Sequence, residues 1–330
     1  MAKPLYRIVF MGTPDFAVPS LKALCEAGMA PVLCVSQPDR PQGRKHKILP
    51  TPVRAAAEAA GIEVIQPEKV RNQAFLNAIK AAEPAFIVTA AYGRILTDQV
   101  LSVPRIAPVN VHASLLPKYR GASPIQAALV NQDKITGVSV PRMTSEMDAG
   151  PVYRRADYQI PEGMRADELS RELADLGGEI LPGVLRDIAE GKLTPQPQNE
   201  AEASYVPLLD KHSGAVFWEK QSAGAIEGLI RGLYPWPAAY AYTHKGKRVK
   251  LLQGKAFAED DPALPEDLLR GKEAGTLLSA ADKSLWFQTA DGILRVDALQ
   301  VAGSRAMSTA DCAHNYRPGL RFASASEERA

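Results

Sequence analysis

The chain has 330 residues, of which 46% are hydrophobic and 23% are charged, values typical of a globular protein whose length favours two domains. Its 39 Lys and Arg residues against 37 Asp and Glu residues leave a formal net charge of +2. That balance excludes a general electrostatic attraction to nucleic acid, so any such partner must be held by local patches.

The N-terminal sequence and the cysteines both bear on the compartment. The opening MAKPLYRIVFMG lacks the basic region and long apolar run of a signal peptide, and no apolar stretch is long enough to span a membrane. Cys25, Cys34 and Cys312 form neither a close-spaced metal pair nor an even disulfide set. We therefore expect structural thiols in a cytoplasmic protein without a membrane partner.

Short runs rich in β-branched residues alternate with helical patterns along the first half of the chain. This alternation is typical of a parallel sheet covered by helices. Strands are predicted over residues 7–11, 31–36, 63–65, 85–91, up to 112, and 136–143, and helices from about 19 and over 51–60, 72–82, 123–131 and 168–189. The sequence thus predicts an α/β, Rossmann-like, mostly parallel sheet domain over residues 1–190.

A proline-rich stretch without periodicity, residues 191–208, is the predicted linker. After one helical stretch over 223–233, the pattern changes to short strands at 249–253, 276–278, 285–289 and 293–300. Asp291 and Gly292 between the last two are a strong hairpin signal. We expect residues 209–330 to form a smaller β-barrel domain of the oligonucleotide-binding (OB-like) type.

Three polar residues near the middle of the chain are expected to form one site. Asn110 and His112 are two positions apart, so they share a face of an extended strand at about 6.5 to 7 Å. Asp148 lies in the turn-rich segment 144–150. Because ligands of open α/β sheets bind outside the carboxyl ends of the strands, Gly12, Tyr92 and His112 should lie along one edge.

These residue types suit acyl transfer. A neutral histidine accepts and returns a proton, an asparagine amide donates to a developing oxyanion, and a carboxylate orients the histidine. No serine or cysteine is placed as a covalent nucleophile, which favours direct attack by a substrate amine. The alternative is that Asn110 ends a strand, His112 is a satisfied buried group and Asp148 only makes a turn.

Two basic clusters are candidate nucleic-acid contacts. Residues 37–47 (QPDRPQGRKHK) form a long, proline-punctuated loop of the kind that is often functional, and 244–250 (HKGKRVK) lie on the predicted β-domain. Each cluster has an alternative explanation that accounts for it equally well. The first is then simply a solvated loop, and the lysines of the second protect a sheet edge against pairing with another strand. Residues 12–15 (GTPD) occupy the place of a dinucleotide-binding turn but lack its glycine pattern, which disfavours a nicotinamide site.

At these residues the chain resembles the methionyl-tRNA formyltransferase family over nearly its whole length. The resemblance rests on residues 10–17 (FMGTPDFA), 36–44 (SQPDRPQGR), 90–93 (AAYG), 110–117 (NVHASLLP) and 234–237 (YPWP). The motif at 110–117 alone is shared by the wider folate-dependent formyltransferases. The loop and the β-rich second half narrow the resemblance to the tRNA-modifying family. Ala149 departs from the threonine that this family often has beside the aspartate.

The resemblance implies that the chain transfers the formyl group of 10-formyltetrahydrofolate, without a metal, to the α-amine of initiator methionyl-tRNA for translation initiation. It implies a catalytic set of Asn110, His112 and Asp148. The implied folate-binding residues are Tyr92, Gly93, Ser114, Leu115, Leu116 and Pro117. The implied tRNA contacts are Arg40, Arg44, Lys45, Lys47, Lys245, Lys247 and Arg248. We expect a monomer.

Other functions remain alternatives at this point. The nearest is a folate-dependent formyltransferase that acts on an amino sugar or small amine. A second is a noncatalytic RNA-binding protein, which would bind tRNA but release no tetrahydrofolate. A third is a nicotinamide oxidoreductase, against which the missing glycine pattern argues.

Overall fold

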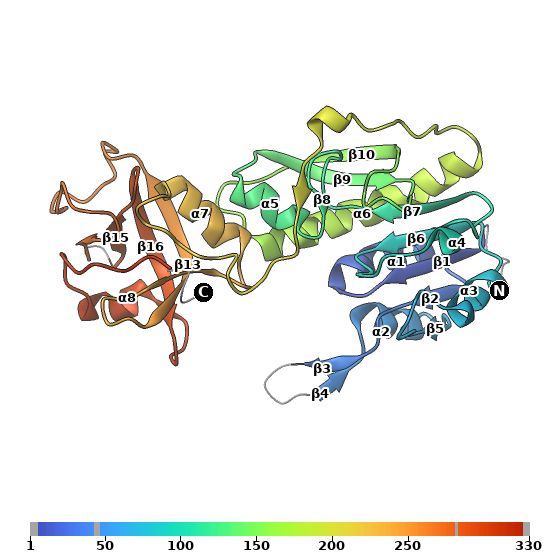
Figure 1. The fold of residues 1–330 in the computed structure, drawn as a ribbon, viewed down its shortest axis with the longest axis horizontal. Coiled ribbons are helices and arrows are strands. Elements are labelled where there is room, and N and C mark those ends of the chain that lie inside the picture. Colours follow the sequence, from blue (N-terminus) through green and yellow to red (C-terminus); the bar gives the residue numbers. More distant parts are fainter. Residues whose placement is uncertain (1–5, 43–46, 281–282, 326–330) are drawn as a thin grey trace. The chain divides into compact units, whose positions relative to one another are not determined.

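The computed structural model describes residues 6–42, 47–280 and 283–325 of the chain (Figure 1). Its contacts divide into two compact units. The first comprises Met1–Pro124, Ile135–Gln159 and Ser170–Val206, and the second comprises Ile125–Lys134, Ile160–Leu169 and Pro207–Ala330. Each unit therefore contains more than one segment of the chain.

A five-stranded parallel sheet in the order β5-β2-β1-β6-β7 forms the centre of the first unit. Its strands are β1 (Ile8–Gly12), β2 (Leu33–Val35), β5 (Val64–Ile65), β6 (Phe86–Ala90) and β7 (Ala107–Val111). Every residue of β1 and β6 is buried, as expected for strands covered on both faces. The predicted parallel α/β sheet is thus confirmed.

Helices cover this sheet, and capping side chains fix where several of them begin. Thr51 accepts a hydrogen bond from the backbone of Arg54 at the start of α2, and Asn72 accepts one from Phe75 at the start of α3. The helices are α1 (Val18–Glu26), α2 (Pro52–Ala59), α3 (Gln73–Ala81), α4 (Asp98–Leu101) and α6 (Ala166–Ala189), with a short 3-10 turn η1 (Asp15–Ala17) before α1. In α6, a Cβ at Gly177 would lie 2.7 Å from Val111, so the glycine permits close helix-to-sheet packing.

An antiparallel hairpin extends the sheet beside β7. It consists of β9 (Ile135–Pro141) and β10 (Val152–Gln159). Isolated bridges join Val109 of β7 to Arg142, just after β9, and Ser139 of β9 to His112, just after β7. Strand β10 was not predicted from the sequence. Its residues read VYRRADYQ and lie mostly exposed or half-buried after the first two, so the chain carries no apolar alternation there that would indicate a strand.

Two further strand pairs involve segments that the sequence analysis expected to be loop and linker. The basic loop forms the hairpin β3 (Arg40–Gln42) and β4 (Lys47–Leu49). The predicted linker contains η2 (Glu200–Glu202) and β11 (Tyr205–Val206), and β11 pairs in parallel with β8 (Arg120–Gly121). A segment that lacks hydrophobic periodicity is therefore hydrogen-bonded to the first unit.

The second unit contains an antiparallel sheet in a half-barrel arrangement, which confirms the predicted smaller β-domain. Its elements are α5 (Pro124–Val130), α7 (Ala223–Gly232), β12 (Ala239–Tyr242), β13 (Arg248–Phe257), β14 (Leu277–Ser279), β15 (Leu285–Gln288), β16 (Ile293–Val301), β17 (Met307–Ser308), α8 (Thr309–Cys312) and η3 (Ala313–Asn315). Its core is mostly aliphatic, and three aromatic rings meet within it, with Phe287 at 5.2 Å from Trp218 and 4.9 Å from Phe322 between centroids. Within the described parts of the chain, no helix has the length and apolar character needed to cross a membrane.

Candidate active site

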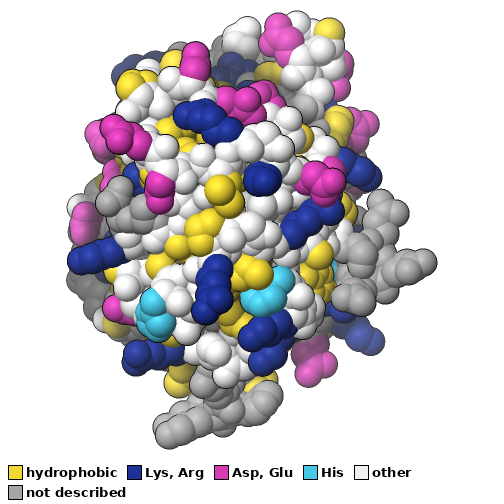
Figure 2. Space-filling view, turned by 90° about the vertical axis from the view of Figure 1, so that its left-hand side faces the viewer, with side chains coloured by type: hydrophobic (Ala, Val, Ile, Leu, Met, Phe, Trp, Pro, Cys, Tyr) yellow, Lys and Arg dark blue, Asp and Glu magenta, His cyan; other side chains and the backbone are white. Residues whose placement is uncertain are grey.

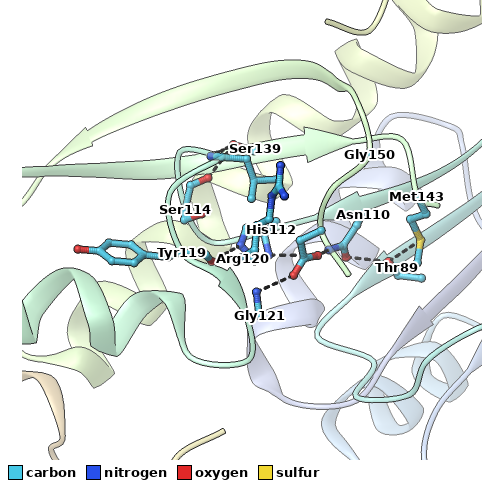
Figure 3. Close-up of polar contacts among 12 residues, drawn as sticks. Thr89, Asn110, His112, Ser114, Tyr119, Arg120, Gly121, Ser139, Met143 and Gly150 are labelled. Carbon is cyan, nitrogen blue, oxygen red and sulfur yellow. Dashed lines mark hydrogen bonds and ion pairs between the residues drawn. The ribbon is translucent and has the colours of Figure 1, made fainter. Parts of the chain in front are cut away.

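The carboxyl end of β7 carries Asn110 and His112 toward the same side (Figure 3). The backbone of His112 is held by a pair of hydrogen bonds with Ser139 of β9, each 2.9 Å long. The hydroxyl of Thr89 on β6 donates to Asn110 Oδ1 at 2.7 Å. Both side chains therefore have fixed positions between neighbouring strands.

Asp148 meets both of these side chains through one oxygen. Its Oδ1 lies 3.4 Å from Asn110 Nδ2 and 3.6 Å from His112 Nδ1, and its Oδ2 accepts a 2.9 Å hydrogen bond from the backbone N–H of Gly121. A carboxylate only accepts, so the amide atom that faces it must be the nitrogen. The structure thus brings the three residues that the sequence singled out into one cluster.

His112 is 5% exposed, and an acceptor lies near each nitrogen of its imidazole. Nε2 lies 3.0 Å from the carbonyl oxygen of Tyr119, which can only accept, so this nitrogen carries a proton. Nδ1 faces Asp148 at a distance beyond a hydrogen bond but within reach of an ion pair. Nδ1 is therefore the ring nitrogen at which a proton can be gained or lost.

The loop after His112 has its backbone fixed by serine side chains. Ser139 Oγ donates to the carbonyl of Ser114 at 2.7 Å and accepts from the N–H of Leu116 at 3.0 Å, while Ser114 Oγ donates to the carbonyl of Lys118. Leu116 is buried and its carbonyl accepts from Arg155, whereas Leu115 and Pro117 are half-buried. Hydrogen bonds therefore hold the backbone of this loop in place next to the polar cluster.

Tyr92 and Gly93 follow β6 at the neighbouring position of the same edge. The carbonyl of Tyr92 accepts from Thr13 at 3.1 Å and from the Gln37 side chain at 2.8 Å, which ties together the loops after β1, β2 and β6. The ring of Tyr92 is packed in the core, and burial raises the pKa of its hydroxyl to about 12. Among the described residues, that hydroxyl has no hydrogen-bond partner.

A second polar cluster, which was not predicted from the sequence, adjoins Asp148. Arg120 is fully buried and donates to both carboxylate oxygens of Glu200, to the hydroxyl of Tyr205 and, at 3.0 Å, to Gln198 Oε1. Its hydrogen bonds to Glu200 raise the pKa of the guanidinium and lower that of the Glu200 carboxyl. No periodicity or motif in the predicted linker marks Gln198 or Glu200, so only tertiary contacts identify them.

The residues expected to contact tRNA have different environments. Arg40, Lys245 and Lys247 are exposed, whereas the Arg248 guanidinium lies 3.6 Å from the centroid of the Tyr240 ring and donates to the carbonyl of Lys211. Arg44 and Lys45 lie outside the described residues, as does the side chain of Lys47. On one face of the second unit, Lys, Arg and His side chains gather around apolar ones (Figure 2).

Neither a metal site nor the groove at the opposite edge of the sheet adds to this polar cluster. In residues 6–42, 47–280 and 283–325, no group of three or more His, Cys, Asp or Glu side chains is placed to hold a metal ion. An open groove of about 1060 Å³ lies at the amino ends of the strands, where it is lined by Arg7, Lys80, Pro84 and Arg105 among others. That edge is opposite to the one that carries Asn110 and His112, so we assign no chemistry to the groove.

Family models match both halves of the chain. Residues 6–185 match the model of the Formyl transferase family, and residues 208–317 match that of the Formyl transferase C-terminal domain. A methionyl-tRNA formyltransferase of Caldanaerobacter subterraneus subsp. tengcongensis is 40% identical over 316 residues, which cover 95% of this chain and 98% of the relative.

Solved structures with the same fold are more distant in sequence. HypX from Aquifex aeolicus, crystallised with tetrahydrofolic acid, superposes with a TM-score of 0.59 at 18% identity over 93% of this chain, which spans about half (46%) of HypX. An N-formyltransferase from Helicobacter canadensis, in complex with folinic acid and dTDP-3-aminofucose, gives a TM-score of 0.62 at 14% identity over 92% of this chain and 100% of that one. At these identities the likeness concerns the fold alone.

The two matched models cover most of the chain, so the chain is a formyl transferase with that family's N-terminal and C-terminal domains. Formyl transferases differ in the molecule that accepts the formyl group. The curated relatives that align with this chain over nearly the full length of both are methionyl-tRNA formyltransferases. The chain belongs to the methionyl-tRNA formyltransferase family. Its activity is the formylation of methionyl-tRNA, with a folate as the source of the formyl group.

Proposed function

We propose that Asn110, His112 and Asp148 are the catalytic residues that transfer the formyl group of 10-formyltetrahydrofolate to the α-amine of initiator methionyl-tRNA. The observation that carries the proposal is the convergence of Asn110 Nδ2 and His112 Nδ1 on Asp148 Oδ1, at 3.4 and 3.6 Å. An amide donor, a proton carrier and a carboxylate in contact are the groups that acyl transfer to an amine requires.

Asn110 stabilises the charge that develops on the formyl oxygen. When the amine attacks the formyl carbon, a tetrahedral oxyanion forms, and the Asn110 amide donates a hydrogen bond to it. The hydrogen bond from Thr89 to Asn110 Oδ1 supports this role, because it keeps the amide nitrogen turned toward the site. The donor is therefore in place before the charge appears.

His112 carries the proton and Asp148 stabilises the imidazolium. The amine loses a proton as it attacks, and the folate nitrogen gains one as it leaves, so one group that accepts and returns a proton serves both steps. The carbonyl of Tyr119 on Nε2 leaves Nδ1 for that exchange. Asp148 lies beside Nδ1, where its negative charge favours the protonated ring during transfer.

The folate and the tRNA are assigned to different parts of the chain. The firm loop of Ser114, Leu115, Leu116 and Pro117, together with Tyr92 and Gly93, borders the cluster and forms the folate pocket within a catalytic domain of residues 1–190. Arg40, Arg44, Lys45 and Lys47, in the basic segment 37–47 of the sequence, contact the acceptor stem. Lys245, Lys247 and Arg248 belong to a domain of residues 209–330 that contacts the tRNA body.

Two further assignments complete the proposal. We place the enzyme in the cytoplasm, an assignment that the unpaired thiols of Cys25, Cys34 and Cys312 support. We also assign it a monomeric state, in which a single chain supplies the whole catalytic set. Size-exclusion chromatography with light scattering measures that state directly.

The test is formyl transfer by purified protein with radiolabelled methionyl-tRNA and 10-formyltetrahydrofolate, each omitted in turn. We expect Asn110→Ala to lower kcat roughly a hundred- to a thousandfold, the loss typical of a removed oxyanion donor. His112→Ala and Asp148→Asn should also be slow while their melting temperatures stay near that of the wild type. Near-normal rates in all three variants would overturn the assignment, and transfer to a nucleotide amino sugar but not to methionyl-tRNA would overturn the acceptor.

A further inference from the structure

Residues 194–206, which we call the strap, return from the end of α6 to the loop that carries Asp148. The backbone of Gln196 exchanges two hydrogen bonds with Val152, at 2.8 and 2.9 Å. Farther along, the carbonyl of Ser204 accepts from the N–H of Arg120, and β11 pairs with β8. The strap is thus fastened on both sides of the site, although its sequence resembles that of a linker.

Gln198 of the strap joins this segment to the turn of Asp148. Its amide nitrogen donates to the carbonyl oxygens of Asp148 and Gly150, each at 2.7 Å, and its amide oxygen accepts from Arg120 Nε at 3.0 Å. The turn between the two carbonyls is a demanding one, because Asp148 has a φ of 53°, a left-handed conformation that costs energy in a non-glycine residue. One side chain therefore holds both ends of the strained turn.

Arg120 fixes the position of Gln198 and of the loop opposite Asp148. Its side chain is 1% exposed, and its charge is balanced by Glu200 of the strap at 2.7 Å. The next residue along the chain, Gly121, provides the N–H that donates to Asp148 Oδ2. The guanidinium of Arg120 thus holds the backbone of Asp148 through Gln198. Arg120 also directly precedes Gly121, whose N–H binds the Asp148 carboxylate.

We propose that Gln198 is a positioning residue for formyl transfer, which holds the left-handed turn of Asp148 so that its carboxylate meets Asn110 and His112. The pair of Arg120 and Glu200 keeps Gln198 in that place. This inference rests on the catalytic role proposed above for Asp148. Gln198 touches no reacting atom and acts only through that carboxylate.

The test compares three single variants in the methionyl-tRNA assay. Gln198→Ala removes the whole amide, and Gln198→Glu keeps its size and an acceptor for Arg120 but loses both donors. We expect each to lower kcat about ten- to a hundredfold, since small misplacements of a catalytic group have effects of that order, with little change in either KM. The control is Gln196→Ala on the same strap, whose exposed side chain donates to the carbonyl of Thr194 and to no other described residue, and it should keep the wild-type rate.

A double-mutant cycle separates positioning from general stability. If Gln198 acts through Asp148, then Gln198→Ala should slow the Asp148→Asn enzyme less than twofold, whereas independent effects multiply. Full multiplication, a wild-type rate for Gln198→Ala, or rescue by Gln198→Glu would each overturn the role of Gln198 alone. A wild-type rate for Asp148→Asn would instead overturn the catalytic assignment and, with it, this inference.

Discussion

The polar part of the site depends most on Arg120, whose guanidinium is buried. A charge without access to water is tolerated only when it is paired and hydrogen-bonded. Arg120 meets this condition with partners that are all supplied by the strap, namely Gln198, Glu200 and Tyr205. Removal of a strap partner should therefore affect folding as well as catalysis.

Glu200 gives a prediction for the dependence of stability on pH. Hydrogen bonds from Arg120 lower the pKa of the Glu200 carboxyl below its ordinary value of 4.5. The ion pair thus stabilises the folded state above pH 4.5, and its contribution is lost as the pH falls through the lower folded-state pKa. We expect Glu200→Gln to lower the melting temperature at neutral pH.

Melting temperatures of both proteins at several pH values check this prediction. The difference between the wild type and Glu200→Gln should shrink as the pH falls below 4.5. Glu202→Gln, a change on the same strap away from Arg120, is the control. A difference in melting temperature that stays constant down to the pH at which the protein unfolds would contradict the role of this ion pair.

At the scale of elements, the hairpin of β3 and β4 is anchored at its base. Asp39 immediately before β3 accepts from Gln66 at 2.7 Å and from the backbone of Thr51 at 3.2 Å, and it pairs with Arg54 at 2.6 Å. These hydrogen bonds, above all the one from Gln66, lower the pKa of the Asp39 carboxyl. The anchor connects the hairpin to α2 and to the loop after β5.

Asp39→Ala should impair the use of tRNA more than the use of folate. Without its anchor the hairpin has more conformational freedom, and ordering it on the acceptor stem costs additional entropy. We expect KM for methionyl-tRNA to rise about tenfold, and KM for 10-formyltetrahydrofolate to stay unchanged, in steady-state assays. Glu68→Ala, which removes an exposed acid after β5, serves as the control. An equal rise in both KM values would count against the hairpin as a tRNA element.

At the scale of the whole molecule, a net charge of +2 leaves tRNA binding to local groups of cations. Lys245 and Lys247 are exposed at the turn between β12 and β13, where they are free to approach a phosphate backbone. Arg248 at the start of β13 is instead occupied with Tyr240 and Lys211. The three neighbours should therefore contribute unequally.

Salt dependence measures these contributions. The logarithm of the tRNA binding constant falls as the logarithm of the salt concentration rises. Each phosphate contact that is lost makes this line less steep, by somewhat less than one unit of slope. We expect Lys245→Ala and Lys247→Ala each to lower the slope for tRNA binding, and Arg248→Ala chiefly to lower the melting temperature because its stacking on Tyr240 is lost. Filter binding at several salt concentrations tests this, and unchanged slopes for both lysine variants would exclude the turn from the tRNA surface.

Local patterns predicted most of the fold but not all of the site. The strands of the parallel sheet follow from apolar runs, and the helices that begin near residues 51 and 72 follow from patterns that also act over short distances. The same applies to the placement of Asn110 and His112 on one face. By contrast, β10 is mostly solvent-exposed, and Gln198 meets Asp148 across 50 positions of the chain, so neither leaves a local pattern.

The order of synthesis gives the strap one more consequence. The residues of the proposed catalytic cluster, 110 to 148, leave the ribosome well before residues 198 to 206, which hold the turn of Asp148 and pair with β8. Because chains emerge from the amino end and fold as segments become available, the parallel sheet can form on the nascent chain while the clamp from Gln198 is still absent. On the role proposed for Gln198, the newly made enzyme acquires full activity only once the strap has emerged and docked.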